Sequence, residues 1–320
     1  MNTLKTLIAA TLAACALQAW AQGYPDKPVH LIISFTPGSS TDIVARVVSQ
    51  KLSDMWGQPV VADNRAGAGG SIGSNVVAKA APDGYTLLVN SSAHAVNPAI
   101  YAKLPYDTTK DFIDIAPLSI QPNVLVVDAS SPYKSVADLL NAAKAKPGAI
   151  NWGHAGLGSG THLSTEKFIA ATQIKVTQIP FKGTPEVISA IFSKSVDCYW
   201  APISAAISNI KAGKLRALAV STPKRNSRLP DVPTTGEAGV VGADSPLWFG
   251  LWAPAGTPAH IIAKISADTR KALADPGVRE KLANLGNDIM DMPPEEFAAF
   301  VRSEIAGYDK VVKSAGIEPQ

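Results

Sequence analysis

The sequence VHLIISFTPGSSTDIVARVV, residues 29–48, joins two different patterns of apolar residues. Its first part, residues 29–35, is an apolar run of the kind found in strands that are buried on both faces. Its last part repeats apolar residues at helical spacing, at Val44, Val48 and then Leu52. A proline, a glycine, two serines and a threonine lie between them. The stretch therefore predicts a strand that turns directly into the N-terminus of a helix.

Strand-like and helix-like segments keep alternating after this stretch. PVVAD and YTLLVN predict two more strands, and GGSIGSNVVAKAA predicts a helix between them. We expect the apolar side chains of that helix to face the core: Ile72, Val76, Val77 and Ala80. This strand–helix rhythm predicts an α/β fold with a doubly wound sheet.

A second strand–helix series runs from NVLVVDA to LRALAVS, and a proline-rich passage follows it. The chain then ends with a tryptophan-rich strand, LWFGLWAP, and three helical segments that have no complete sheet of their own. The simplest arrangement is two α/β lobes joined by two crossovers, near residues 122 and 224. Residues 22–122 and 224–320 form the predicted first lobe, and residues 123–223 form the second.

The first 21 residues have the features of a secretory signal peptide. Lys5 gives a positive start, an apolar run follows, and Ala19-Trp20-Ala21 fits the A-x-A cleavage pattern. Residues 12–15 also resemble a lipoprotein cleavage box, which would place a lipid on Cys15. We predict cleavage after Ala21, because an apolar run that ended at Cys15 would be short. No later stretch approaches about 20 consecutive apolar residues, so we expect no transmembrane helix.

The composition argues against a nucleic-acid partner and against an internal disulfide. The 320 residues include 29 Lys and Arg against 26 Asp and Glu, and both signs are spread along the chain. Because no basic stripe is present, we expect no nucleic-acid partner. Without its leader the chain keeps one cysteine, Cys198, and cannot form an internal disulfide. We expect Cys198 to be a small buried apolar residue.

Three loops share one design, since each follows a predicted strand, contains small or hydroxyl residues, and opens a helix. They are residues 36–42, 91–94 and 156–162. In open α/β sheets, ligands bind at the carboxyl ends of the strands. Helix N-termini there present unpaired N–H groups and a positive dipole end, which suit an anion and most simply a carboxylate. The alternative is that Ser39, Ser159 and their neighbours only cap helices.

Sequence motifs for catalysis and metal binding are missing. GLGSG places its serine one position late for G-x-S-x-G, and no dinucleotide, P-loop or H-E-x-x-H motif occurs. The five histidines lack metal-ligand spacing, so we expect no enzyme, no cofactor and no metal. Asp42 is predicted to stabilise its own helix. His154 is the predicted ligand contact because it ends a strand, whereas a structural role is the alternative for all three loop histidines, His94 and His162 included.

Many separated motifs occur in an order that is similar to one known family. They include YPDKPVHLIISFTPGSSTDIVAR, GQPVVADNRAGAGGSIGSNVVAKAAPDGYTLL, PFKGTPEVI, LPDVPTTGEAG and GLWAPAGTP. Together they resemble the Bug family, the periplasmic solute-binding proteins of tripartite tricarboxylate transporters, over essentially the whole exported chain. The resemblance implies a type II periplasmic-binding-protein fold, a monomer whose two lobes close on a small carboxylate. It also implies a periplasmic location and the membrane components of such a transporter as partners.

In that family the first loop and the glycine-rich loop of the second lobe grip a carboxylate, partly through backbone N–H groups. The predicted ligand-binding residues, from this resemblance and from the loops, are Phe35, Pro37, Ser39, Ser40, Thr41, Asp42, Ser91, Ser92, Ala93, His94, His154, Ala155, Gly156, Gly158, Ser159, His162, Lys182, Gly183 and Thr184. Ser39 and His154 depart from the family pattern and add hydrogen-bonding groups. With Phe35, Trp152 and Phe181 near the same strand ends, the hypothesis is a dicarboxylate, and an aromatic one such as terephthalate fits it.

Two other functions use the same fold. A ligand-sensing subunit for a membrane kinase would have the same cleft and a different partner. A secreted hydrolase or lyase would need an activated nucleophile or an acid–base pair, and the sequence supplies neither.

Overall fold

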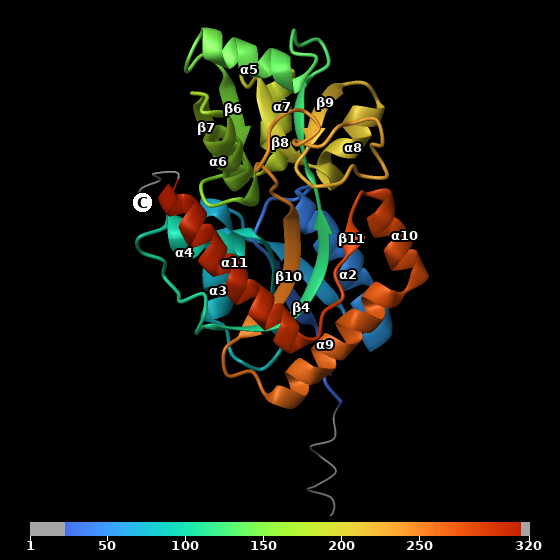
Figure 1. Cartoon of the computed structure of the whole chain (residues 1–320). Coiled ribbons are helices and arrows are strands. Elements are labelled where there is room, and N and C mark those ends of the chain that lie inside the picture. The colour runs from blue at the N-terminus through green and yellow to red at the C-terminus, as the bar shows by residue number, and fades with distance from the viewer. Residues whose placement is uncertain (1–22, 315–320) are drawn as a thin grey trace, which may run out of the picture.

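The computed structural model describes residues 23–314, so the predicted signal peptide lies outside the described residues. Strands within them form two separate sheets, one of six strands and one of five, with helices around both (Figure 1). The α/β fold class is therefore confirmed. Among the described residues, no helix is long and apolar enough to cross a membrane.

The first sheet has the strand order β11-β4-β10-β3-β1-β2. Its members are β1 (Val29–Ile33), β2 (Val60–Asn64), β3 (Thr86–Ser91), β4 (Phe112–Gln121), β10 (Leu247–Pro254) and β11 (Asp288–Ile289). β2, β1 and β3 run parallel, whereas β10 is antiparallel to both of its neighbours, β3 and β4. A strand from late in the chain thus lies at the centre of a sheet that the N-terminal part begins.

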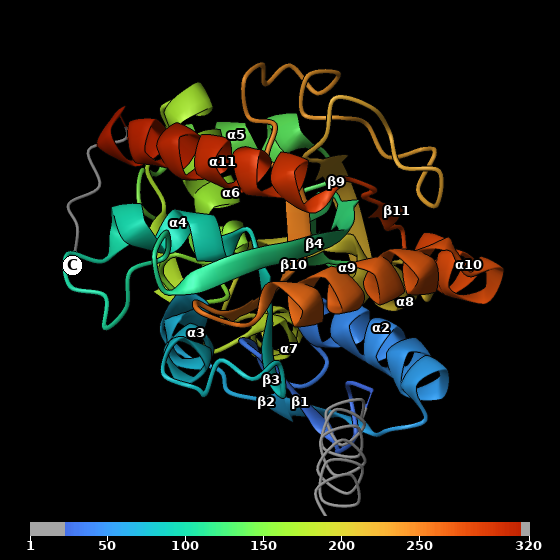
Figure 2. The same cartoon turned by 90° about the horizontal axis from the view of Figure 1, so that it is seen from below.

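The helices of this part of the molecule cover both faces of the first sheet. They are α2 (Ser40–Trp56), the 3-10 turn η1 (Ala68–Gly70), α3 (Ser71–Ala78), α4 (Ala93–Ile100), α9 (Ala259–Ala274), α10 (Pro276–Asn284) and α11 (Pro294–Ser314). Figure 2 shows α9 and α11 on opposite sides of β4 and β10. One apolar cluster packs α2, α9 and α10 on the sheet, and another packs α3, α4 and α11.

The second sheet has the strand order β7-β6-β8-β5-β9. Its strands are β5 (Asn123–Asp128), β6 (Asn151–His154), β7 (Thr177–Pro180), β8 (Cys198–Pro202) and β9 (Leu215–Val220). Its helices are α5 (Val136–Ala145), α6 (Gly160–Thr172), α7 (Thr184–Phe192) and α8 (Ile203–Lys211). β6 is parallel to β7 and β8, and β5 is antiparallel to β8 and β9. Cys198 is buried in this core, as the sequence predicted.

The chain crosses between the sheets at two places. In the first crossover only Pro122 separates β4 from β5. After β9, residues 221–245 still pack on the second sheet: Leu229 and Val240 join its apolar clusters, and Ser245 N–H donates to Ser221 O at 2.8 Å. Residue 224, where the sequence predicted the return, lies inside this packed stretch, and the chain reaches the first sheet at Leu247.

One sequence prediction about the core is wrong. Ile72 and Val76 of α3 are 49% and 39% exposed. Ala80 is half-buried, and Val77 is buried. The buried face is instead carried by small residues. A Cβ on Gly73 would lie 2.9 Å from the backbone oxygen of Arg65, so the helix packs too close to the segment after β2 for a larger side chain there. The strands β4 and β11 were not predicted, whereas α4 is the helix that the loop at residues 91–94 was expected to open.

Candidate ligand-binding cleft

Two helix N-termini, one from each sheet's set of helices, face a common cavity. Ser39 caps α2 and Ser159 caps α6 with nearly the same backbone angles, φ −71° and ψ 161° against φ −71° and ψ 155°. Each serine oxygen accepts a hydrogen bond from the third N–H group of its helix, at 3.3 Å from Asp42 N and 3.1 Å from His162 N. The first two N–H groups of each helix have no intrahelical acceptor.

Those free N–H groups belong to residues that line the cavity. The lining residues are Phe35, Ser39, Ser40, Thr41, Ser91, Ala155, Ser159, Gly160, Thr161, Thr184, Pro202 and Leu247. None of these described residues carries a charged side chain, so an anion would meet helix ends and hydroxyl groups rather than lysine or arginine. The cavity measures about 20 Å³, which is room for little more than one water molecule. A larger ligand could therefore enter only if the two sides moved apart.

Tight contacts between the two sides surround the cavity. Tyr101 Oη on the first side donates a hydrogen bond to Leu157 O on the second, at 2.9 Å. A Cβ added to Gly69 would lie 2.0 Å from the same Leu157 oxygen. On the other rim, a Cβ on Gly183 would lie 2.0 Å from Thr36 Oγ1. The structure therefore shows the two sides closed on each other, and glycines permit the closest approaches.

Asp42 lies beside the cavity, yet its charge is already compensated. Its carboxylate accepts hydrogen bonds from Gly38 N at 2.9 Å, Arg46 Nε at 2.8 Å and Asn64 Nδ2 at 2.9 Å. The side chain is 6% exposed. This carboxylate organises the first loop and the start of α2, which agrees with its predicted role as a helix-stabilising charge.

The predicted ligand-binding residues fall into three groups. Those that line the cavity are Phe35, Ser39, Ser40, Thr41, Ser91, Ala155, Ser159 and Thr184. Those that pack against the opposite side around it are Ser92, Gly156, Gly158 and Gly183. Those that are not among the lining residues and not among these glycine contacts are Pro37, Asp42, Ala93, His94, His154, His162 and Lys182.

The three loop histidines lie away from the cavity lining. His94 is fully buried, with its ring 4.4 Å from that of Trp252 and 4.8 Å from that of Phe112. Burial lowers the pKa of His94 to about 3. This imidazole is therefore a neutral core side chain rather than a ligand contact.

His154 shares a strand face with Trp152, because side chains two apart in a strand point the same way. Trp152 packs on Phe168 of α6, and His154 packs on His162 with ring centres 4.7 Å apart. Burial, and then the neighbouring His162, lower the pKa of His154 to about 4. The structure thus places His154 against His162 of α6, outside the residues that line the cavity.

The sequence reasoning also missed lining residues. Gly160 and Thr161 lie inside the loop that was singled out, and their position after the cap Ser159 was the available signal. Pro202 and Leu247 end and begin strands in distant parts of the chain, and only the folded chain brings them together. No group of three or more potential metal ligands occurs in the described part of the chain.

Comparison with known proteins is consistent with this geometry. Residues 44–317 match the model of the TctC family, described as the tripartite tricarboxylate transporter family receptor. The chain belongs to the TctC family. The resemblance to Bug proteins is also confirmed: BugT of Bordetella pertussis is 35% identical over 320 residues, which cover 99% of this chain and 98% of BugT.

Solved structures of TctC relatives have the same fold. The R. palustris protein Rpa4515, solved with adipate, is 36% identical with a TM-score of 0.90, over 93% of this chain and 100% of that one. MatC from Rhodopseudomonas palustris, solved with bound malate, is 33% identical with a TM-score of 0.86, over 90% of this chain and 100% of MatC. The periplasmic binding protein BugD has a TM-score of 0.90 at 31% identity, over 93% of this chain and 100% of BugD. The predicted periplasmic-binding-protein fold is thus confirmed.

Proposed function

We propose that this TctC-family protein captures a small dicarboxylate in the periplasm and delivers it to the membrane components of a tripartite tricarboxylate transporter. The observation that carries the proposal is the pair of helix N-termini, of α2 and α6, that meet across one cavity. Opening and closing of the two lobes would admit and then enclose the ligand.

The cavity supplies neutral hydrogen-bond donors for a carboxylate. The N–H groups of Ser40 and Thr41 come from one helix start, and those of Gly160 and Thr161 from the other. Hydrogen bonds to an ionised acceptor are about twice as strong as neutral ones, and exclusion of water strengthens them further. Two relatives solved with dicarboxylates, adipate and malate, support this class of ligand.

Fewer residues than the sequence suggested support an aromatic ligand. Phe35 lines the cavity, whereas Trp152 is buried in the core of the second sheet and His154 packs against His162 of α6. Terephthalate therefore remains in the proposal as one dicarboxylate among several.

The hydrogen bonds around Ser159, which lines the cavity, do not support the hydrolase alternative. Ser159 Oγ is bonded to Thr161 Oγ1 at 3.0 Å and accepts from His162 N, and His162 Nδ1 accepts from Gly158 N at 3.4 Å. Within residues 23–314, no base is thus placed to activate the serine. A sensor subunit would use the same cleft. Incubation of the protein with solubilised membranes separates the two functions, because the protein would capture a transporter subunit in one case and a kinase in the other.

A thermal-shift experiment tests the carboxylate class. The exported chain is heated with adipate, malate, terephthalate, phthalate, citrate, aspartate or nicotinate, with terephthalamide as the uncharged control. A ligand at 1,000 times its Kd stabilises the folded state by about 4 kcal/mol, which raises Tm by several degrees. A shift with a dicarboxylate and none with the amide is expected. Equal shifts with the amide, or no shift with any acid after unfolding and refolding to remove co-purified ligand, would refute the proposal.

A further inference from the structure

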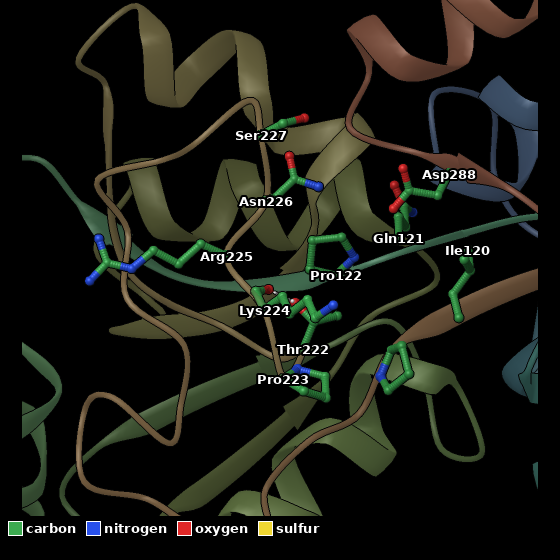
Figure 3. A pocket seen from close by; sticks show the side chains of 11 residues that line it. Ile120, Gln121, Pro122, Thr222, Pro223, Lys224, Arg225, Asn226, Ser227 and Asp288 are labelled. Atoms are coloured by element: carbon green, nitrogen blue, oxygen red, sulfur yellow. Dashed lines mark hydrogen bonds between the residues drawn. The ribbon is translucent and has the colours of Figure 1, made fainter.

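A second and larger cavity, which we call the crossover pocket, lies where the chain passes between the sheets. It measures about 460 Å³ and is lined by the end of β4, Pro122, residues 222–227, Pro246 and Asp288 of β11 (Figure 3). This volume falls within the range of about 300–1,000 Å³ that is usual for small-molecule sites. None of the predicted ligand-binding residues lines it.

The crossover pocket and the cleft cavity lie on opposite faces of both crossovers. Pro246 lines the pocket, whereas the next residue, Leu247, lines the cavity. Neighbouring residues of the returning chain thus line different cavities. At the other crossover Pro122 lines the pocket, whereas the Asn123 amide donates to Ser164 of α6, whose first turn faces the cleft, at 2.9 Å.

The pocket lining combines apolar residues with one buried polar atom that lacks a partner. Its apolar residues are Ile120, Pro122, Pro223 and Pro246. Gln121 is 1% exposed, and its Oε1 accepts from Ser204 N at 3.1 Å. The Gln121 amide nitrogen has no hydrogen-bond partner within the described chain.

The charged groups of the lining define what could fill it. Lys224 and Asp288 are exposed, and neither has an ion-pair partner among residues 23–313. Asp288 pairs with Ile120 in the sheet, so it lies beside Gln121. Arg225 extends away from both and binds Glu237 Oε2 at 2.8 Å (Figure 3). Within the described residues, the lining therefore offers a free cation at Lys224 and a free carboxylate at Asp288.

We propose that the crossover pocket is a second ligand site, which takes a small monocarboxylate with an apolar body and a hydroxyl or amide at its far end. The carboxylate pairs with Lys224. The far group donates to the Asp288 carboxylate. The apolar body covers the prolines of the lining, which suits one ring or a short chain.

Occupancy of this site favours closure of the cleft. Because the two cavities lie on opposite faces of the crossovers, a rotation that opens the cleft narrows the crossover pocket. An occupant of the pocket resists that rotation and holds the lobes closed. This part rests on the proposed function, since it needs a ligand in the cleft, and the coupling must be reciprocal between the two sites.

Calorimetric titration with 4-hydroxybenzoate tests the pocket on the whole exported chain. Three proteins are compared: wild type, Thr222→Trp, which fills the pocket, and Ala306→Trp, which adds the same ring at an exposed position on α11. Wild type and Ala306→Trp are expected to bind one more equivalent than Thr222→Trp. Benzoate and phenol, which each lack one polar end, are expected to bind this site about tenfold more weakly. Equal stoichiometry in all three folded proteins overturns the site.

The coupling is measured with whichever dicarboxylate the thermal shift identifies. Saturating 4-hydroxybenzoate is expected to tighten its binding at least about fivefold in wild type and to leave Lys224→Met unchanged. Unchanged or weaker binding in wild type overturns the coupling. If no dicarboxylate binds, the proposed function fails, and the stoichiometry experiment still decides the pocket by itself.

Discussion

Removal of the Tyr101 hydroxyl should weaken ligand binding without weakening the fold. Tyr101 Oη donates to Leu157 O at 2.9 Å, and this hydrogen bond joins the two sides of the cleft. Because the ring is half-buried, Tyr101→Phe keeps the apolar contacts and deletes one bond. A hydrogen bond of this kind contributes about 0.5–1.5 kcal/mol net. The bond exists only when the lobes meet. Its removal therefore makes closure less favourable by the free energy that the bond contributed.

The expected size of the effect follows from that free energy. Since 1.4 kcal/mol is tenfold in an equilibrium constant, Tyr101→Phe should raise Kd about two- to twelvefold. Most of the change should appear as faster release, because the bond must break before the cleft opens. Calorimetry gives Kd, and stopped-flow displacement gives the release rate.

The control for this variant is Tyr133→Phe. Tyr133 is also half-buried, it lies on the second lobe away from the cleft, and its hydroxyl makes no described hydrogen bond. The Tyr133→Phe variant should leave Kd unchanged. If Tyr101→Phe binds as tightly as wild type, or if it loses the same unfolding free energy with and without ligand, then the bond does not act through closure and the reasoning is refuted.

Two further predictions concern acid stability and closure. Burial lowers the pKa of His94 from 6.5 to about 3, so below pH 6.5 the unfolded chain binds a proton that the folded chain refuses. The free energy of unfolding should therefore fall by up to about 1.4 kcal/mol for each pH unit as the pH drops from 6.5 to 3. Denaturant titrations should show a flatter slope in His94→Leu and an unchanged slope in the exposed control His260→Leu. An unchanged slope in His94→Leu would count against the assignment. Gly183→Ala should weaken ligand binding at least about tenfold in calorimetry, because its Cβ would meet Thr36 Oγ1 when the lobes close, and Thr36→Ala in the same chain should restore much of the affinity. Failure of that rescue would show that the contact with Thr36 is not what limits closure.

Local patterns were enough to predict the parts of the site that are local. The strand at residues 29–33, the cap Ser39 and the start of α2 follow one another in the sequence, and the pattern of apolar, small and polar residues specifies all three. The same holds for Ser159 and α6. The two loops could therefore be identified as one kind of site before the fold was known.

The parts that failed depend on long-range packing. The strand pattern of β4 is weak, because β4 contains Pro117 next to a register shift against β10. The exposure of Ile72 follows from the close packing of Gly73 on another segment, which helical periodicity cannot reveal. The position of His154, by contrast, was available from the sequence, since it must share a strand face with the large apolar Trp152.

The donors that converge on the cleft cavity include backbone N–H groups of two helix starts, and this has an evolutionary consequence. A point mutation at Ser40, Thr41 or Thr161 alters the shape and hydroxyl content of the cavity but leaves the backbone donors in place. On the proposed function, a lineage can therefore change the carbon skeleton that it recognises one residue at a time while it keeps its hold on a carboxylate. Every intermediate along such a path still binds an acid, so selection never has to cross a step at which binding is lost.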